Sequence, residues 1–137
     1  MTRSTRTGRP PVHLIDTEAE NLTNLALGVA ETMPQVSELL MNEIARAKMH
    51  NAKRMPSDVV TMHSTVVFTD EGSGAERTVQ LVYPAEADIS NGRISILTPV
   101  GAGLIGLREG HSIRWPDREG RERQLTIQKV TQPARGQ

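Results

Sequence analysis

The amino-acid sequence predicts an α+β fold, in which a short antiparallel helical hairpin precedes a mostly antiparallel β-sheet with one short helix. Three observations predict it. Apolar residues follow helical spacing up to Met55 and alternate from there on. A turn signal near residues 31–34 divides the helical part, and turn residues separate several β-branched runs. The 137 residues fit one domain, or one small domain with an appendage.

The first helix is predicted from a capping signal and an apolar stripe. Residues 12–15 form a short extended run after Pro10 and Pro11, and a helix begins at Asp16 or Thr17. Thr17 and Glu20 have the spacing of a capping box, in which each side chain bonds the other residue's backbone amide. The stripe consists of Leu22, Leu25, Ala26 and Val29.

A second helix follows the same pattern. Thr32 and Gln35 again have capping-box spacing, and Pro34 is tolerated only in a first helical turn. The helix is predicted to run to about Met49, with an apolar face of Val36, Leu39, Leu40, Ile44 and Ala47. Two such helices joined by a short turn form an antiparallel hairpin, a short coiled coil. We expect its tip at Glu31, Thr32 and Met33.

The remainder of the chain is predicted to be a sheet. Six runs are expected as strands: residues 59–62, 66–69, 78–83, 93–97, 112–115 and 124–130. Turn chemistry predicts hairpins at residues 72–74, 91–92 and 117–120. The small-residue segment between Pro99 and Gly110 is long enough for about two helical turns.

Composition excludes several function classes. Sixteen basic and sixteen acidic residues give a net charge of zero, which removes the electrostatic footprint of a non-specific nucleic-acid binder. We expect no direct sequence-specific contact with nucleic acid either. Three aromatic residues, Phe68, Tyr83 and Trp115, cannot form a stacking platform for bases or line an aromatic pocket. The absence of cysteine excludes thiolate chemistry and favours a reducing compartment, so we expect the cytoplasm. No apolar run of signal-peptide or membrane-spanning length follows the basic start.

The motifs with catalytic or cofactor-binding potential are weak. Gly101, Gly103 and Gly106 match the dinucleotide fingerprint G-x-G-x-x-G, but no long helix and parallel strand can follow them. We interpret them as glycines that let a short helix pack closely on a sheet. Four scattered histidines match no metal-ligand spacing, and no nucleophile elbow is present. The sequence therefore predicts no catalytic residue, no metal, no cofactor and no enzymatic activity.

Three segments resemble a known family. They are MPSDVVTMHS (residues 55–64), LVYPAEADISNGRISILTPVGAGLIGLREGHSI (81–113) and NEIARAKM (42–49). Over residues 12–131 the chain resembles the bacterial regulator of nucleoside diphosphate kinase (Rnk) family. The block ISILTPVGAGLIGLREG also resembles the signature of the Gre transcript-cleavage factors, whose C-terminal domain has an FKBP-like fold. A Gly-Asp pair usually closes that block, whereas this chain has Gly110 and His111.

The resemblance implies a division of the chain into four parts. Residues 1–11 would be a disordered basic tail, and residues 12–54 would hold the short strand and the helical hairpin. Residues 55–131 would form the FKBP-like domain of the Gre C-terminal type, and residues 132–137 would be a second tail. Whether the hairpin stands clear of the sheet domain or folds back on it stays open at the level of sequence.

The resemblance also implies a partner, RNA polymerase, bound at the rim of its secondary channel. Position by position, the docking loop of the Gre domain falls on Leu97, Thr98, Pro99, Val100 and Gly101; Leu104 belongs either to this face or to the core. Gre cleavage uses two acidic residues at the coiled-coil tip to help hold a magnesium ion, whereas this tip has Glu31 alone. Each hairpin arm, about 22 Å long, is also short. We therefore expect a non-enzymatic bacterial transcription regulator that competes with Gre factors without stimulating cleavage.

The sequence suggests three other functions. The family name suggests control of the level or activity of nucleoside diphosphate kinase, by direct contact or through transcription. The hairpin could serve as a dimerisation element. Prolyl isomerase activity is suggested by the FKBP-like fold. It is discounted because such activity uses an aromatic-lined pocket, which three aromatic residues cannot form. Fold analogy alone also establishes no function. No membrane partner is expected.

Overall fold

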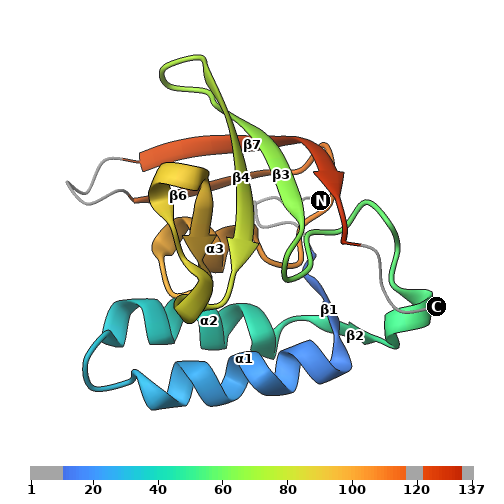
Figure 1. Ribbon diagram of the computed structural model, residues 1–137, viewed down its shortest axis with the longest axis vertical. Coiled ribbons are helices and arrows are strands. Elements are labelled where there is room, and N and C mark those ends of the chain that lie inside the picture. Colours follow the sequence, from blue (N-terminus) through green and yellow to red (C-terminus); the bar gives the residue numbers. More distant parts are fainter. Residues whose placement is uncertain (1–10, 117–121, 134–137) are drawn as a thin grey trace, which may run out of the picture.

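The computed structural model describes residues 11–116 and 122–133 (Figure 1). The chain enters through strand β1 (His13–Ile15) and continues into the hairpin helices α1 (Asp16–Gly28) and α2 (Pro34–Ala45). The other strands are β2 (Lys48–His50), β3 (Thr65–Asp70), β4 (Ala75–Val82), β5 (Arg93–Ser95), β6 (Ser112–Pro116) and β7 (Glu122–Thr131). Helix α3 spans Pro99–Leu104, and the 3₁₀ helices η2, η3 and η4 span Ala52–Arg54, Pro84–Glu86 and Ile89–Asn91. The α+β prediction is confirmed.

The main sheet has the strand order β5-β4-β3-β7-β6 within the described residues. Every neighbouring pair is antiparallel except β4 and β5, which are parallel. Side chains of β3 alternate between half-buried and buried, with Val66 and Phe68 in the core, because successive residues of a strand point to opposite faces. The predicted hairpin at residues 72–74 joins β3 to β4.

Three local predictions are wrong. Residues 59–62 are buried but form no strand, since Val59 makes only an isolated bridge to Arg108. Residues 91–92 turn the chain between Asp88 and Arg93, which form an isolated antiparallel bridge, but they join no pair of antiparallel strands, because they lie in the connection between the parallel strands β4 and β5. The second helix ends at Ala45, and the chain at Met49 is strand β2. The predicted turn at residues 117–120 lies outside the described residues.

The predicted capping boxes do not form. The residues that cap α1 and α2 are Ile15 and Met33, and neither makes a side-chain capping bond. Pro34 does occupy the first turn of α2, where its missing N–H costs nothing. The helix starts are therefore set by the strand that precedes α1 and by the proline, rather than by Thr17 and Thr32.

Strand β2 pairs in parallel with β1 and closes the base of the hairpin. The pairing places Lys48 beside His13 and His50 beside Ile15, and the Lys48 amide donates to the Val12 carbonyl at 2.8 Å. The two ends of the hairpin are thereby fixed to each other.

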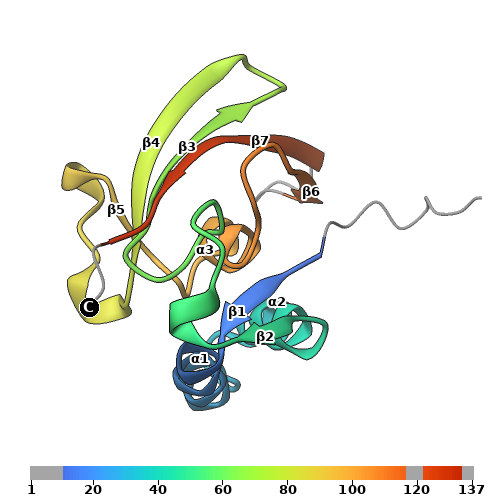
Figure 2. The ribbon, with the colours of Figure 1, turned by 90° about the vertical axis from the view of Figure 1, so that its right-hand side faces the viewer.

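The hairpin folds back on the sheet domain. Figures 1 and 2 show α1 and α2 side by side beneath the sheet domain, with α2 next to α3. Leu22 of α1 and Leu40 of α2 belong to the same buried cluster as Leu104 and Ile127. A hydrogen bond of 2.8 Å from Ser37 Oγ to the Ala26 carbonyl joins the two helices. One continuous core therefore holds the hairpin and the sheet together.

Candidate functional site

A hydrogen-bonded loop precedes helix α3 and contains the residues predicted to contact a partner. The Thr98 hydroxyl donates to the Ser95 carbonyl at 2.8 Å and accepts from the Gly101 amide at 3.0 Å. The Leu97 amide donates to Ser95 Oγ at 2.9 Å. Thr98 is thus the capping residue of α3, a position that favours threonine, and the loop has a fixed shape.

The structure brings these five residues together but exposes them unequally. Pro99 is exposed, Thr98 and Val100 are half-buried, and Leu97 and Gly101 are buried. A methyl group on Gly101 would overlap the Ser95 carbonyl and crowd Ile96, so a side chain is excluded there. Thr98, Pro99 and Val100 are therefore the residues that a partner can reach, while Leu97 and Gly101 shape the loop. Contact with a partner stays a prediction.

Leu104, left open between docking face and core, is fully buried. It lies in the core cluster with Leu40 of the hairpin and Ile105. A charge at Leu104 would therefore disrupt folding rather than report on a docking surface.

The hairpin tip is exposed at Glu31, Thr32 and Met33. The Met33 amide donates to the Val29 carbonyl at 2.7 Å, which closes the turn between the helices. Leu27 and Met33 are exposed apolar side chains on either side of that turn. The tip therefore presents one carboxylate flanked by apolar surface.

The helical hairpin is strongly acidic. Residues 16–45 contain six acidic residues and no lysine or arginine. The balanced net charge of the whole chain hides this asymmetry, because basic residues lie on both sides of the hairpin, in residues 1–11 and 46–54. The signal was present in the sequence and would have been found by counting charges for each predicted element.

His111 stands where the resemblance to the Gre signature implies an aspartate, and its side chain contacts the turn. The Arg108 amide lies 3.4 Å from His111 Nδ1, which accepts from it. Burial lowers the pKa of His111, and the nearby Arg108 guanidinium lowers it further, against the opposing effect of Asp58. A ring nitrogen of His111 therefore serves as the backbone acceptor at this turn.

The glycine motif does not form a nucleotide site. Helix α3 has six residues, and the strand that follows it, β6, pairs antiparallel with β7, so the βαβ unit that the fingerprint requires is absent from these residues. Gly106 has a φ of +83°, and a side chain there would overlap Val12 and crowd the backbone of His13. The interpretation as close packing fits this geometry.

Within residues 11–116 and 122–133, no group of three or more His, Cys, Asp or Glu side chains could hold a metal ion. Over the same ranges, no helix is long and apolar enough to cross a membrane.

The chain was compared with known proteins. Residues 55–132 match the family described as "Transcription elongation factor, GreA/GreB, C-term". The chain is 41% identical over 107 residues to the regulator of nucleoside diphosphate kinase of Escherichia coli (strain K12), covering 78% of this chain and 79% of that protein. It is 39% identical over 74 residues to the transcription elongation factor GreA of Azorhizobium caulinodans, covering 54% of this chain and about half, 47%, of that protein.

A solved structure has a similar fold over nearly the whole chain. A prokaryotic transcription elongation factor GreA/GreB from Nitrosomonas europaea superimposes with a TM-score of 0.71 at 38% identity, covering 90% of this chain and 99% of that one. The match includes the helical part as well as the sheet domain. The chain therefore belongs to the family of the regulator of nucleoside diphosphate kinase, and its residues 55–132 form a GreA/GreB C-terminal domain.

Proposed function

We propose that this protein is a non-enzymatic transcription regulator that binds RNA polymerase near the rim of the secondary channel and competes there with Gre factors. The observation that carries the proposal is the GreA/GreB C-terminal domain at residues 55–132. The loop at residues 97–101, the docking loop in this proposal, has an ordered shape because the Thr98 hydroxyl caps α3. Pro99 is exposed on this loop. In this proposal Pro99, together with the half-buried side chains of Thr98 and Val100, contacts the polymerase.

The length and the charge of the hairpin favour a protein that binds the polymerase without stimulating transcript cleavage. Helix α1 has 13 residues and is about 20 Å long, and both helices are held against the sheet domain by the shared core. The tip offers only Glu31 among residues 29–33, whereas a hard cation such as Mg²⁺ is better held by two carboxylates. We therefore expect the hairpin to occupy the channel entrance without completing a magnesium site.

A transcript-cleavage assay tests this function. Stalled elongation complexes are incubated with GreA, with this protein, or with both, and the shortened transcripts are measured. The proposal expects no cleavage from this protein alone and a dose-dependent loss of GreA-stimulated cleavage when both are present. Stimulation of cleavage by this protein alone would contradict the proposal. Unchanged GreA activity at saturating protein would contradict it as well.

A second candidate function is regulation of nucleoside diphosphate kinase. It is favoured by the name of the Escherichia coli relative. Activity of the purified kinase, measured with and without this protein, tests direct modulation. A change in kinase level in cells with no change in the purified assay would instead favour an effect through transcription. Either function places the protein in the cytoplasm.

A further inference from the structure

Three basic side chains share one face of the small sheet at the base of the hairpin. His13 and Lys48 are partners in register, and His50 is the partner of Ile15. Because partners in register and residues two apart point to the same face of a sheet, all three share the face of Ile15. His13 Nδ1 lies 2.9 Å from His50 Nε2, with ring centroids 5.1 Å apart and planes inclined at 42°. This face therefore presents two imidazoles beside an ammonium group.

The loop after α3 adds two more basic side chains. Ile15 packs with Val59, and Val59 forms a backbone bridge with Arg108. The Arg108 guanidinium donates through Nε to Asp58 Oδ2 at 3.1 Å, and His111 Nδ1 accepts from the Arg108 amide at 3.4 Å. One ion pair therefore holds the guanidinium, whose other nitrogens are not engaged by that bond.

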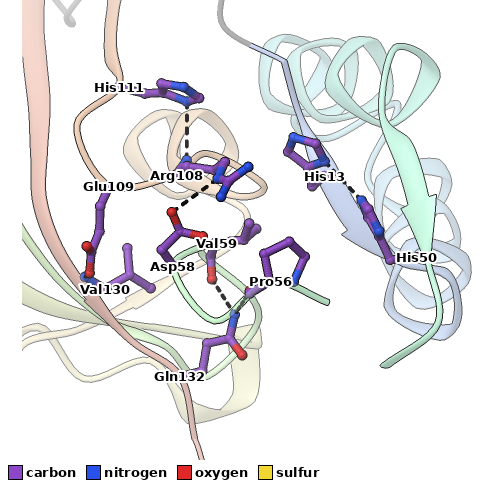
Figure 3. A network of polar contacts seen from close by, with 10 residues as sticks. All are labelled: His13, His50, Pro56, Asp58, Val59, Arg108, Glu109, His111, Val130 and Gln132. Carbon is purple, nitrogen blue, oxygen red and sulfur yellow. Dashed lines mark hydrogen bonds and ion pairs between the residues drawn. The ribbon is translucent and has the colours of Figure 1, made fainter. Parts of the chain in front are cut away.

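Figure 3 shows the Arg108 guanidinium on the side of its loop that faces His13. The five side chains, called here the basic cluster, are His13, Lys48, His50, Arg108 and His111. Burial lowers the pKa of His13, and the positive charges of the other four members lower it further. Burial and Arg108 lower the pKa of His111, while Asp58 opposes the shift. With neutral imidazoles the cluster and Asp58 together carry one positive charge, and with protonated imidazoles they carry four.

We propose that the basic cluster binds a small phosphate-type oxyanion, such as a pyrophosphate group. Arginine and protonated histidine donate charge-assisted hydrogen bonds to phosphate oxygens, and the planar arginine group matches their spacing. The anion would also offset the repulsion that the other four members of the cluster exert on a positive charge at His13. Binding therefore strengthens as the pH falls through the range in which imidazoles gain charge.

The charges favour this ligand over two others. A metal ion between the two facing imidazole nitrogens would meet repulsion from Lys48 and Arg108, and two nitrogen ligands do not complete a typical zinc site. A nucleic-acid backbone is long enough to reach the acidic hairpin and would be repelled by it. The hairpin begins at Asp16, directly after β1, and has no lysine or arginine through residue 45. A compact anion meets neither obstacle.

The ligand would join two parts of the fold. His13, Lys48 and His50 belong to the base of the hairpin, whereas Arg108 and His111 belong to the sheet domain. A ligand that binds only the folded chain raises its stability. Occupation of the basic cluster should therefore fix the hairpin more firmly to the sheet.

The test is a titration of the full chain with sodium pyrophosphate at constant ionic strength, followed by NMR of the imidazole carbon and proton signals. At about pH 6 a bound anion favours the protonated imidazoles, and we expect saturable shifts of His13, His50 and His111. His63, which pairs with Glu86 at 2.8 Å, is the internal control and should not shift. At about pH 8 the affinity should be about tenfold weaker, because the charge-assisted bonds from the imidazoles are lost.

Two variants locate the site. His13→Gln and Arg108→Gln should each weaken pyrophosphate binding about tenfold, and His63→Gln should leave it unchanged. Because Arg108→Gln also removes the ion pair with Asp58, His13→Gln decides the outcome if Arg108→Gln fails to fold. The proposal is overturned by equal shifts of all four histidines, or by wild-type affinity in His13→Gln. Saturation by Zn²⁺ without any response to pyrophosphate overturns it, as does tighter binding of a short single-stranded oligonucleotide.

Discussion

The backbone amide of His13 donates to the carbonyl of Gly106 at 2.9 Å, across 93 positions of sequence. The bond ties β1, and with it the start of the hairpin, to the loop that follows α3. The Gly106 amide in turn donates to the Val60 carbonyl at 2.9 Å. The hairpin and the sheet domain are therefore joined by backbone hydrogen bonds as well as by the shared core.

Gly106→Ala should destabilise the fold more than Gly110→Ala. Both glycines have positive φ values, +83° and +87°, and alanine costs about 1 kcal/mol or more in that conformation. At Gly106 the added methyl group also overlaps the Val12 side chain, whereas at Gly110 it meets nothing within 4 Å. The overlap adds about 1–3 kcal/mol. Urea unfolding of both variants measures the difference, and equal losses would contradict the close packing at Gly106.

Gly28→Ala should stabilise the protein. Gly28 is the last residue of α1, and a methyl group there has no neighbour within 4 Å. Alanine is favoured over glycine in a helix by up to about 1 kcal/mol. Thermal unfolding should show a higher midpoint for the variant. A lower midpoint would mean that the end of α1 needs the conformational freedom of glycine.

Substitutions at Leu104 and Pro99 should distinguish an effect on stability from an effect on polymerase binding. Leu104→Ala removes a fully buried side chain and should cost about 2–5 kcal/mol of stability. Pro99→Ala changes an exposed residue and should alter stability by less than about 0.5 kcal/mol. In the proposed function it should weaken polymerase binding by about 1 kcal/mol, roughly fivefold.

Pro84→Ala is the matched control for Pro99→Ala, since Pro84 is also exposed and also begins a helix, η3. It should leave polymerase binding unchanged. Equal losses of binding in the two variants would remove the case for the loop before α3 as the docking face.

Stability should fall as the pH drops below the ordinary histidine pKa of 6.5. The pKa values of His13 and His111 are lowered in the folded protein, in both cases first by burial. The unfolded chain therefore binds more protons in this range, and the free energy of unfolding decreases on acidification. The stability is fully present above pH 6.5 and is lost as the pH passes through the lowered values. Urea unfolding between about pH 7.5 and pH 5.5, in a buffer without phosphate, measures the slope.

The variant His13→Gln should show a shallower slope than the wild type over this range. Its control is His63→Gln, in which the lowered pKa values of His13 and His111 remain. If the wild-type protein became more stable on acidification, this would contradict the lowered pKa values of His13 and His111.

The α+β class and most strands could be predicted because each depends on local pattern. The alternation in β3, the turn at residues 72–74 and Pro34 at the start of α2 all act over a few residues. Strand β2 could not be predicted, because three residues are too few for a periodic pattern and its pairing with β1 joins positions 35 apart. The end of α2 at Ala45 could not be predicted either, because it depends on the same long-range pairing. Lys48 cannot pair with His13 in a strand and also continue the helix.

The candidate sites also depend on contacts between distant positions, which local sequence patterns do not predict. The loop at residues 97–101 was found through resemblance, but only the structure shows that Leu97 is buried and Pro99 exposed. The contact between His13 and His50 spans 37 positions, so a search for local ligand spacing could not find it. The acidic character of the hairpin, in contrast, can be read from the sequence, because residues 16–45 contain six acidic residues and no lysine or arginine.

The central claim is tested most directly by equilibrium binding of the fluorescently labelled full chain to core RNA polymerase, with unlabelled GreA as competitor. The proposed function predicts saturable binding that GreA reverses completely, together with weaker binding of Pro99→Ala and unchanged binding of Pro84→Ala. Absence of saturable binding, or binding that excess GreA fails to displace, would contradict a shared site on the polymerase.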